Sequence, residues 1–310
     1  MKNNIVERNH MQICSSKKLS IILVNYNTAA LTMQCIESIY KHLVGYDFEI
    51  ILVDNCSIDD SVLKISSSFP DIKIIANSEN LGFGRANNQA LRIATGEYCF
   101  LLNTDTIIFD DSIQKMLNFL DSHQDISIVG AQLLNAEKKL THSYSSSFPS
   151  IFWEIMLFLY PIARLFRWKE KYILRKHGFI DVAYITGADM LIRKRDLDVV
   201  GLFDEDFFMY FEETDLSYRF KCHGFRSVFY PSSQIIHLEG ASFSFKERRE
   251  RLYYDSRKLF YEKHYNNRYC MWANRFHYLS LICWYLASYI IRRDMHNVYA
   301  QKISLFKNYK

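Results

Sequence analysis

Three carboxylates stand close together in one aromatic stretch of the sequence, FDEDFFMYFEETDLSYRF at residues 203–220. Glu212, Glu213 and Asp215 occupy three of four consecutive positions. Like charges held together in apolar surroundings raise the pKa of at least one carboxyl group, which suits a general base that removes a proton from a hydroxyl. The alternative is an acidic helix start stabilised by the helix dipole, with Asp215 paired to Arg219 four residues later.

Polar residues also end three separate apolar runs. Asn25 ends LSIILVN and Asp54 ends FEIILVD, while Asn103, Thr104 and Asp105 follow YCFLL. If these runs are parallel strands, their carboxyl ends meet at the edge of the sheet where ligands bind. Asp54 would accept hydrogen bonds from a ribose or base, and Asp105 would hold a divalent cation that neutralises a leaving diphosphate. Taken singly, each residue is more typical of a helix cap or turn.

The segment NLGFGRANNQA at residues 80–90 combines two glycines with a cation. Gly82 and Gly84 permit close approach of the backbone to a ligand, and Arg85 stands at a predicted helix start, where phosphates bind favourably. Only one residue separates the glycines and no third follows, so this is not the G-x-G-x-x-G fingerprint. His237, in IIHLEGAS, ends an extended stretch, and a single histidine is more often structural than a ligand.

The scaffold for these residues is predicted from an alternation of apolar runs with helical patterns. Strands are expected at 19–25, 48–54, 72–76 and 98–103, and helices at 28–43, 59–69, 85–94 and 110–123. Strand character returns at 180–192 and 226–237, with a helical region ending near residue 222. Near-continuous apolar strands between helices indicate an α/β fold with a mostly parallel sheet covered on both faces.

Composition and charge limit the classes of protein to which this chain could belong. With 49% hydrophobic and 23% charged residues, the 310-residue chain is expected to fold around a sizeable core, and its net charge of +4 does not suggest a nucleic-acid binder. Residues 246–310 carry 14 basic and 5 acidic side chains, whereas the rest carry 24 and 29. A basic, aromatic C-terminal region on an acidic body suits docking on an anionic membrane surface.

Targeting and redox signals favour the cytosol. The seven cysteines are widely spaced and form no C-x-x-C pair, which is typical of reduced thiols, and the N-terminus lacks the apolar stretch of a signal peptide. The apolar segment 276–291 would span roughly 24 Å as a helix, less than the ~30 Å hydrocarbon core. We therefore expect a buried or interfacial helix rather than a membrane span.

Taken in order, the segments SIILVNYNT, VDNCSIDD, NLGFGRANNQA, LLNTDT, ITGADMLIRK, FMYFEETDLSYR and IIHLEGAS resemble the family 2 glycosyltransferases, in particular bacterial rhamnosyltransferase-like members. The resemblance covers about residues 19–242. It implies a GT-A fold in which one nucleotide-sugar-binding α/β domain uses a divalent metal and inverts the anomeric centre. The expected organisation is a polar tail at 1–18, a GT-A domain at 19–242 with an aromatic insert at about 151–177, and a basic helical extension at 243–310.

The resemblance also assigns roles to residues. Asp54 matches the nucleoside-binding carboxylate, and Asp105 matches the metal-binding last aspartate of D-x-D, whose first position is Asn103 here. Glu213 matches the catalytic base, often an aspartate in relatives, with Glu212 and Asp215 as fallbacks. The expected donor-binding residues are Asn25, Asn27, Asp54, Asn55, Asn80, Gly82, Gly84, Arg85, Asn88, Asn103, Thr104 and Asp105. Those expected at the acceptor are Gly187, Ala188 and Asp189, and the metal ligands are Asp105 and His237.

The implied reaction is inverting transfer of a sugar to a hydroxyl of a lipid-linked saccharide in the biosynthesis of a cell-surface polysaccharide such as O-antigen. The expected donor is dTDP-L-rhamnose, with UDP-sugars as the alternative, and the expected cofactor is Mg²⁺ or Mn²⁺. The basic C-terminal region places the enzyme peripherally at the cytoplasmic leaflet. A sugar-phosphate nucleotidyltransferase would release pyrophosphate instead of a nucleoside diphosphate. A non-catalytic binding protein would keep Asp54 without needing the acidic cluster.

Overall fold

The first half of the chain forms four parallel strands in the order β3-β2-β1-β4. The computed structural model describes residues 19–158, 170, 172–238, 246–289 and 295–307, so the tail expected at 1–18 lies outside the described residues. The strands are β1 (Leu19–Asn25), β2 (Phe48–Asp54), β3 (Lys73–Ala76) and β4 (Tyr98–Leu102), and the helices between them are α1 (Ala29–His42), α2 (Ser61–Ser68) and α3 (Phe83–Ile93). Asn25 pairs with Asp54 in register, so the polar ends of β1 and β2 lie side by side.

The second half extends the sheet with a change of direction. Its strands are β5 (Thr106–Ile107), β6 (Ile126–Leu134), β8 (Ile180–Val182), β10 (Asp189–Arg193) and β11 (Arg226–His237). β10 runs antiparallel between β4 and β6, β11 runs parallel to β6, and β5 and β8 pair antiparallel with β11. The predicted α/β architecture with a mostly parallel sheet is confirmed. The strand expected at 180–192 is instead broken, because β9 (Tyr184–Ile185) leaves the sheet to pair with β7 (Tyr144–Ser145).

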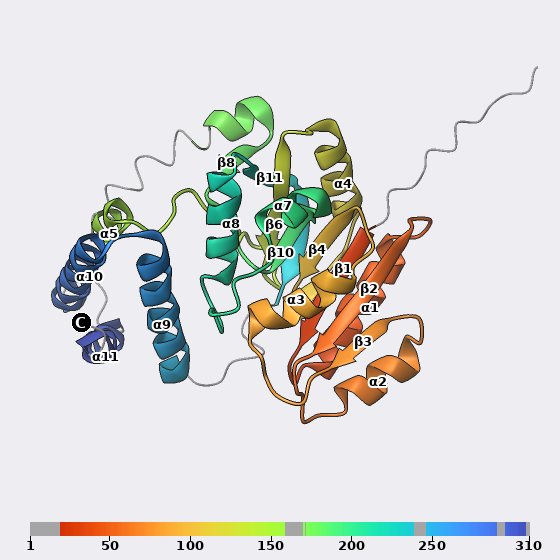
Figure 1. Cartoon of the computed structure of the whole chain (residues 1–310), viewed down its shortest axis with the longest axis horizontal. Coiled ribbons are helices and arrows are strands. Elements are labelled where there is room, and N and C mark those ends of the chain that lie inside the picture. Colours follow the sequence, from red (N-terminus) through yellow and green to blue (C-terminus); the bar gives the residue numbers. More distant parts are fainter. Residues whose placement is uncertain (1–18, 159–169, 171, 239–245, 290–294, 308–310) are drawn as a thin grey trace, which may run out of the picture.

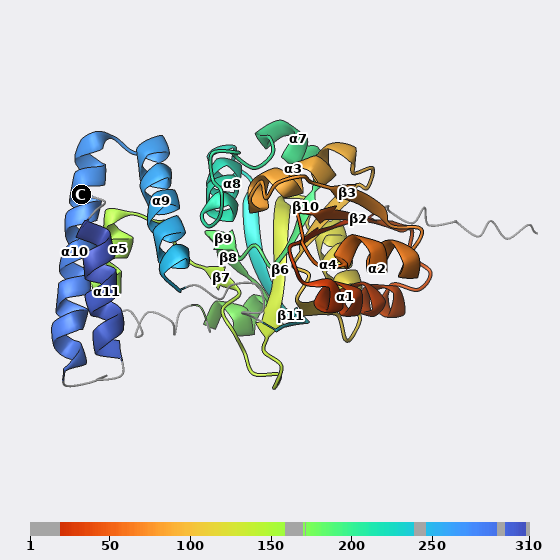
Figure 2. The ribbon, with the colours of Figure 1, turned by 90° about the horizontal axis from the view of Figure 1, so that it is seen from below.

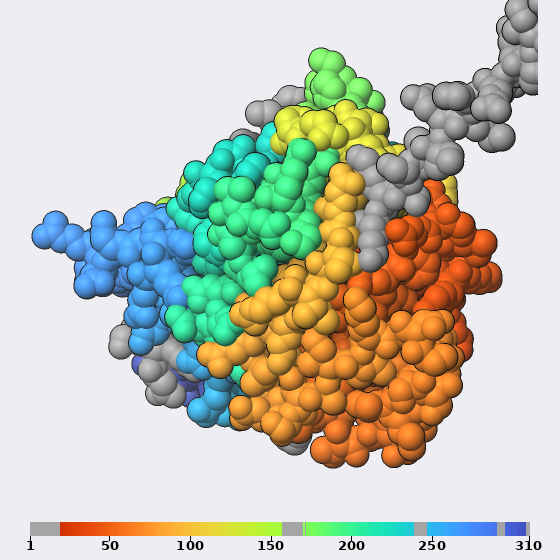
Figure 3. Space-filling view, turned by 45° about the vertical axis from the view of Figure 1, so that its right-hand side comes forward, coloured from red at the N-terminus to blue at the C-terminus, as the bar shows by residue number. Residues whose placement is uncertain are grey.

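Helices cover both faces of the sheet because successive strand residues point to opposite sides. Ile21 and Leu23 of β1 pack with α1, α2 and α4 (Ser112–Ser122), whereas Ile22 packs with α3, α7 (Lys194–Val200) and α8 (Glu212–Cys222). Figure 2 shows the sheet between α1 and α2 on one side and α3 and α7 on the other. Figure 3 shows the surface of α3 lying against the segment that follows α7. The polar strand ends are thereby left at one edge of a fully covered sheet.

A group of helices stands beside the sheet: α5 (Ile151–Phe158), α9 (Lys246–His264), α10 (Asn267–Ser288) and α11 (His296–Lys307) (Figure 1). A buried ionic cluster joins three of them. Glu154 of α5 accepts hydrogen bonds from Arg257 of α9 at 2.6 Å and from His277 of α10 at 2.8 Å. The aromatic insert is therefore tied to the C-terminal helices, although its residues 159–169 and 171 lie outside the described ranges. Within the described ranges, no helix is both long and apolar enough to cross a bilayer.

Candidate active site

A cleft of about 390 Å³ opens at the carboxyl ends of β1 and β4, beside the loops that precede β10 and α8. Strand-end loops from several parts of the chain therefore meet in one cavity, as expected for this architecture. The predicted residues that line it are Asn55, Asn80, Gly82, Asn103, Thr104, Asp105, Gly187, Ala188, Glu212, Glu213 and His237.

Asp105 and His237 are brought together by the antiparallel pairing of β5 with β11, in which Thr106 stands opposite His237. The His237 Nε2 atom lies 3.1 Å from Asp105 Oδ1, and both side chains are partly exposed. Two ligands at neighbouring octahedral positions around Mg²⁺ lie about 3 Å apart, so the pair fits a divalent cation. Among the described residues, no group of three His, Cys, Asp or Glu is placed to hold a metal. The remaining ligands would come from a diphosphate and water.

Asp54 and Asn25 form a buried polar pair at the ends of β1 and β2. Asp54 Oδ1 accepts a hydrogen bond from Asn25 Nδ2 at 2.7 Å, and Oδ2 accepts one from the Ser57 backbone N–H at 3.0 Å. Asp54 is 3% exposed and Asn25 is completely buried, and neither belongs to the residues that line the cleft. The two side chains hold the ends of β1 and β2 together. Of residues 54–60, only Asn55 lines the cavity.

The loop at 80–84 is fixed by a close backbone approach. Gly82 has a φ of +84°, and a Cβ atom there would lie 2.3 Å from the Phe208 carbonyl oxygen, so only glycine fits. The next residue, Phe83, donates its backbone N–H to the same oxygen at 3.0 Å. Asn55 braces the loop by donating to Asn80 Oδ1 at 2.9 Å. The glycine thus joins the loop at 80–84 to the segment that carries the acidic cluster.

The two glutamates at the start of α8 differ in their surroundings. Glu212 is 5% exposed, and its pKa is raised well above its usual value by burial and by the neighbouring charge of Glu213. Burial raises the pKa of Glu213 to about 7. Gly187 is a neighbour of Glu213 in the cleft, because a Cβ atom added to it would lie 3.9 Å from the Glu213 Cβ. Glu213 is therefore a carboxyl group poised to accept a proton near neutral pH.

The backbone directly before α8 is strained. Tyr210 and Phe211 have φ values of +69° and +66°, a left-handed conformation that side-chain-bearing residues rarely adopt. Phe211 is held by packing on Phe260 of α9, with ring centroids 5.7 Å apart. Ser256, also on α9, donates to the Met209 carbonyl oxygen at 2.7 Å. The C-terminal helix α9 therefore supports the elbow that presents both glutamates.

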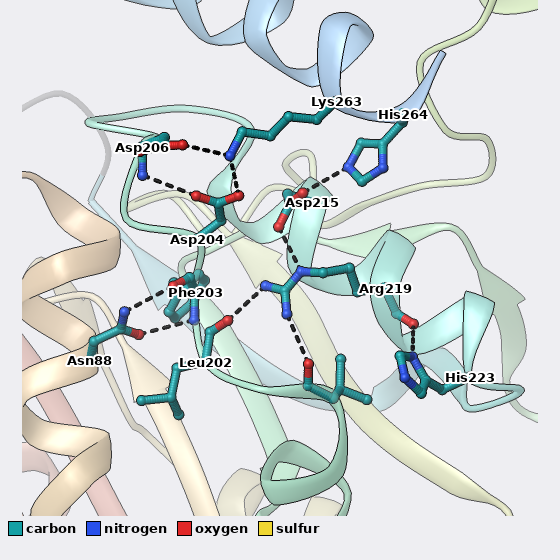
Figure 4. Close-up of polar contacts among 11 residues, drawn as sticks. Asn88, Leu202, Phe203, Asp204, Asp206, Asp215, Arg219, His223, Lys263 and His264 are labelled. Carbon is teal, nitrogen blue, oxygen red and sulfur yellow. Dashed lines mark hydrogen bonds and ion pairs between the residues drawn. The ribbon is translucent and has the colours of Figure 1, made fainter. Parts of the chain in front are cut away.

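Asp215 of α8 does not line the cleft, and its carboxylate lies between Arg219 and His264 (Figure 4). Its carboxylate accepts hydrogen bonds from Arg219 Nε at 2.8 Å and from His264 Nε2 of α9 at 2.7 Å. It is 1% exposed, so no acceptor hydroxyl can reach it. The fallback assignment of Asp215 as the base is wrong, and the helix-stabilising ion pair with Arg219 is the correct interpretation.

Asp189 is also placed differently from the expectation. It is completely buried on β10, and its Oδ2 accepts a hydrogen bond from the Ala131 backbone N–H of β6 at 2.6 Å. Burial raises the pKa of this carboxyl well above its usual value. The prediction that Asp189 faces the acceptor is wrong, because the side chain points into the core while Gly187 and Ala188 line the cleft.

Four predicted donor residues support the walls instead of lining the cavity. Asn88 donates to the Phe203 carbonyl oxygen at 2.9 Å and accepts from its N–H at 3.0 Å (Figure 4). Arg85 donates its Nε–H to the Glu205 carbonyl oxygen at 2.8 Å and does not line the cleft. Gly84 lies under Phe203, whose Cβ would be 3.2 Å from an added Cβ. Asn27 accepts from the Ile58 N–H at 2.8 Å.

Sequence reasoning missed several residues that line the cleft: Val24, Tyr26, Thr28, Phe83, Leu133, His142, Thr186, Phe208, Met209, Tyr210 and Arg248. Tyr26 directly follows Asn25 at the end of β1, so its place at a strand end could have identified it as a cleft residue. Arg248 comes from α9, outside the family resemblance, and only the basic run KERR hints at it.

Comparison with known proteins gives a family match. The model described as "Glycosyl transferase family 2" matches residues 20–211. The chain is 29% identical over 137 residues to the minor teichoic acid biosynthesis protein GgaB of Bacillus subtilis, which covers 42% of this chain and 15% of that protein. It is 27% identical over 205 residues to a low-salt glycan biosynthesis hexosyltransferase of Haloferax volcanii, covering 65% of this chain and 61% of the relative.

A third relative is the N-acetylglucosaminyl-diphospho-decaprenol L-rhamnosyltransferase of Mycobacterium tuberculosis, 24% identical over 207 residues that cover 62% of this chain and 67% of the relative. The first two relatives are thus matched over less than two thirds of their own length. Among solved structures, a mannosyltransferase from Pyrobaculum calidifontis in complex with GDP-Man and Mn²⁺ superposes with a TM-score of 0.59 at 15% identity, covering 94% of this chain and 86% of that one. This likeness is one of fold, and the expected GT-A architecture is confirmed.

Proposed function

Because this chain belongs to glycosyl transferase family 2, we propose that it transfers a sugar from a nucleotide diphosphate to an acceptor hydroxyl with inversion of the anomeric centre. One observation carries the proposal. Glu213, whose pKa is raised to about 7, lines the same cleft as the Asp105–His237 pair. A proton acceptor and a cation-binding pair in one cavity match the two requirements of the transfer, a deprotonated nucleophile and a neutralised leaving group.

The donor side is formed by Asn55, Asn80 and the tripeptide 103–105, with Asp54 beneath them. Asp105 and His237 would hold Mg²⁺ or Mn²⁺, which supplies positive charge to the leaving diphosphate when bound. These residues orient the diphosphate and stabilise the charge that develops on it.

On the acceptor side, Glu213 takes the proton of the acceptor hydroxyl. The oxygen attacks the anomeric carbon from the face opposite the diphosphate, the bond from that carbon to the diphosphate oxygen breaks, and the nucleoside diphosphate leaves. Gly187 and Ala188 line the same cavity as Glu213 and add little side-chain volume to it. The proton remains on Glu213 until water removes it.

The proposed donor is dTDP-L-rhamnose, with a UDP-sugar as the alternative, and the proposed acceptor is a lipid-linked saccharide of a cell-surface polysaccharide. The name of the mycobacterial relative describes an L-rhamnosyltransferase acting on a diphospho-decaprenol saccharide, and the Bacillus relative is named for teichoic acid biosynthesis. These names support the class of acceptor. The nucleotide and sugar rest on the sequence resemblance.

Peripheral binding to the cytoplasmic leaflet is proposed on one exposed face of α10. This outer stripe consists of Arg268, Trp272, Arg275 and Leu279, which are spaced by three or four residues. Trp272 is 47% exposed and Leu279 is 53% exposed, and the Arg275 guanidinium lies 4.9 Å from the Trp272 ring. Aromatic and basic residues on one helix face suit the interface of an anionic bilayer.

The function is tested with a panel of dTDP-, UDP- and GDP-sugars, each with and without a polyprenyl-linked acceptor pool. We expect one donor to give nucleoside diphosphate release that requires Mg²⁺ or Mn²⁺ and increases with acceptor. Release of pyrophosphate from a nucleoside triphosphate, or no turnover with any donor, would contradict the proposal. The variant Asp105→Asn should also weaken Mn²⁺ binding in a direct titration, which does not depend on turnover, while the exposed Asp198→Asn should not.

A further inference from the structure

A second, larger cavity of about 700 Å³ lies among the helices beside the sheet. Its walls come from α5, α9, α10 and α11. They are largely aromatic and apolar, with Trp153, Tyr253, Tyr254, Leu281, Trp284 and Tyr299 among them. A cavity of this size and lining is typical of a site for an apolar small molecule.

The two cavities meet at the strained elbow. Tyr210 lines both of them, and it stands two residues before Glu212. Arg248 and Arg249, neighbours at the start of α9, line one cavity each: Arg248 the catalytic cleft and Arg249 the aromatic cavity. Tyr210 therefore forms part of the wall of both cavities, and the neighbouring residues Arg248 and Arg249 contribute one guanidinium group to each.

We propose that the aromatic cavity binds the isoprenoid chain of the lipid-linked acceptor, with Arg248 and Arg249 holding its diphosphate and the saccharide reaching Glu213. The inference rests on the proposed glycosyl transfer and extends it to the lipid portion of the substrate. The order of the compartments, a polar cleft, two arginines and an apolar cavity, is the order of saccharide, diphosphate and polyprenyl in such a lipid. Guanidinium groups are well suited to diphosphate oxygens.

The polar groups of the cavity favour a lipid over a second nucleotide. Lys302 is already paired with Glu250 at 3.0 Å, and His277 is hydrogen-bonded to the buried Glu154 at 2.8 Å. Because Lys302 and His277 already have these partners, they are less available to hydrogen-bond the base or ribose of a nucleotide. Helix α10 contributes residues both to the aromatic cavity and to the outer stripe. An isoprenoid chain that leaves the bilayer at the outer stripe would therefore have to travel only about the width of one helix to enter the cavity.

Binding of farnesyl diphosphate and of farnesol to the full chain is measured by isothermal titration calorimetry in the absence of a sugar donor. Ala287→Trp places a large ring in the cavity, and Ala300→Trp is its matched control on the exposed face of α11. We expect Ala287→Trp to weaken farnesyl diphosphate binding by roughly tenfold or more, because several buried methylene groups lose their site. Ala300→Trp should bind like the wild type.

Arg249→Ala provides an independent variant, since Arg249 is exposed and its loss leaves the core intact. It should weaken the binding of farnesyl diphosphate and leave farnesol binding unchanged. The inference is overturned if the wild type binds neither probe, if Ala287→Trp binds like Ala300→Trp, or if Arg249→Ala affects both probes equally.

Turnover separates this inference from the proposed function. With a polyprenyl-linked acceptor, Ala287→Trp should lose roughly tenfold in kcat/KM, whereas with the same saccharide on a methyl aglycone it should match the wild type. Equal losses on both acceptors would contradict the lipid site while leaving glycosyl transfer intact. Absence of turnover with either acceptor would refute the proposed function, and farnesyl diphosphate binding would still test the cavity.

Discussion

Glu212 and Glu213 are adjacent in the sequence, but their surroundings give them different protonation behaviour. Glu212 is buried, and its Oε2 has no hydrogen-bond partner among the described residues, so the neutral carboxylic acid is favoured. Glu213 reaches the cleft, and burial raises its pKa to about 7. Two carboxyl groups whose pKa values are raised to different extents can divide the roles of structural acid and catalytic base.

Replacing the proposed base tests this division. Glu213→Gln keeps the shape of the side chain and removes the proton acceptor, so turnover should fall by about two to four orders of magnitude while nucleotide binding stays within a few-fold. Rates and donor dissociation constants provide the measurement. Glu262→Gln, an exposed Glu on α9, is the matched control and should behave like the wild type. Unchanged turnover in Glu213→Gln would move the role to Glu212.

The pH profile follows from the same pKa. A general base must be ionised, and because the pKa of Glu213 is raised to about 7, the active carboxylate is lost as pH falls through that value. We expect kcat with saturating substrates to drop about tenfold per pH unit below 6 and to level off above 8. Steady-state rates between pH 5 and 9 check this. A flat profile over that range would contradict a base with a raised pKa.

At the scale of elements, α9 is part of the catalytic architecture. It carries Phe260 against the strained Phe211, Ser256 against the elbow backbone, and His264 against Asp215 of α8. Lys263 of the same helix contacts Asp204 at 2.5 Å (Figure 4). A left-handed residue costs about 1–3 kcal/mol, so the elbow persists only while such packing holds it. The extension expected at 243–310 is therefore not a detachable appendage.

Shortening Phe260 tests the support that α9 gives to the elbow. Phe260→Ala should lower the free energy of unfolding by about 3–5 kcal/mol, as for other buried aromatic truncations, and should also reduce kcat as the elbow relaxes. Phe306→Ala removes an equally buried ring that packs on Tyr254 instead. It should cost similar stability and keep kcat on a soluble acceptor. Equal kcat losses, measured where both variants are folded, would show that the elbow does not depend on Phe260.

At the scale of the whole molecule, charge is distributed unevenly. Among the described residues, the excess of basic side chains from position 246 onward lies on the helices that stand beside the sheet, and the outer stripe of α10 presents part of it with apolar side chains. Residues of the same region enter the catalytic cleft and the aromatic cavity. The surface proposed to face the membrane and the proposed lipid site are thus built from one set of helices.

Vesicle binding tests the outer stripe without removing α9. The double variant Trp272→Glu/Leu279→Glu should lose at least roughly tenfold in affinity for phosphatidylglycerol vesicles, because it exchanges apolar contacts for repulsion from an anionic surface. Turnover of a soluble acceptor should be retained. The control Leu63→Glu/Val199→Glu changes exposed apolar residues on α2 and α7. Equal vesicle binding by both double variants in co-sedimentation would contradict docking through α10.

The order and type of the elements in the first half could be predicted because their signals are local. The strands expected at 19–25 and 48–54 appear with those bounds, since apolar runs between helices can be buried only as strands covered on both faces. The apolar run at 180–192 could not be divided into its strands from the sequence alone. Its break into β8, β9 and β10 depends on long-range pairing with β11, β7 and β4, which no local pattern records.

The sequence by itself determined which residues had the chemistry, because carboxylates, histidine and glycines at strand ends and helix starts are recognisable from type and spacing. Only the tertiary structure decided which of them share a cavity. Asp105 meets His237 through the β5–β11 pairing, Glu213 reaches the cleft, and Asp215 and Asp189 turn away from it. Side-chain direction depends on contacts between distant segments, and Arg248 enters the cleft only because α9 packs on the elbow.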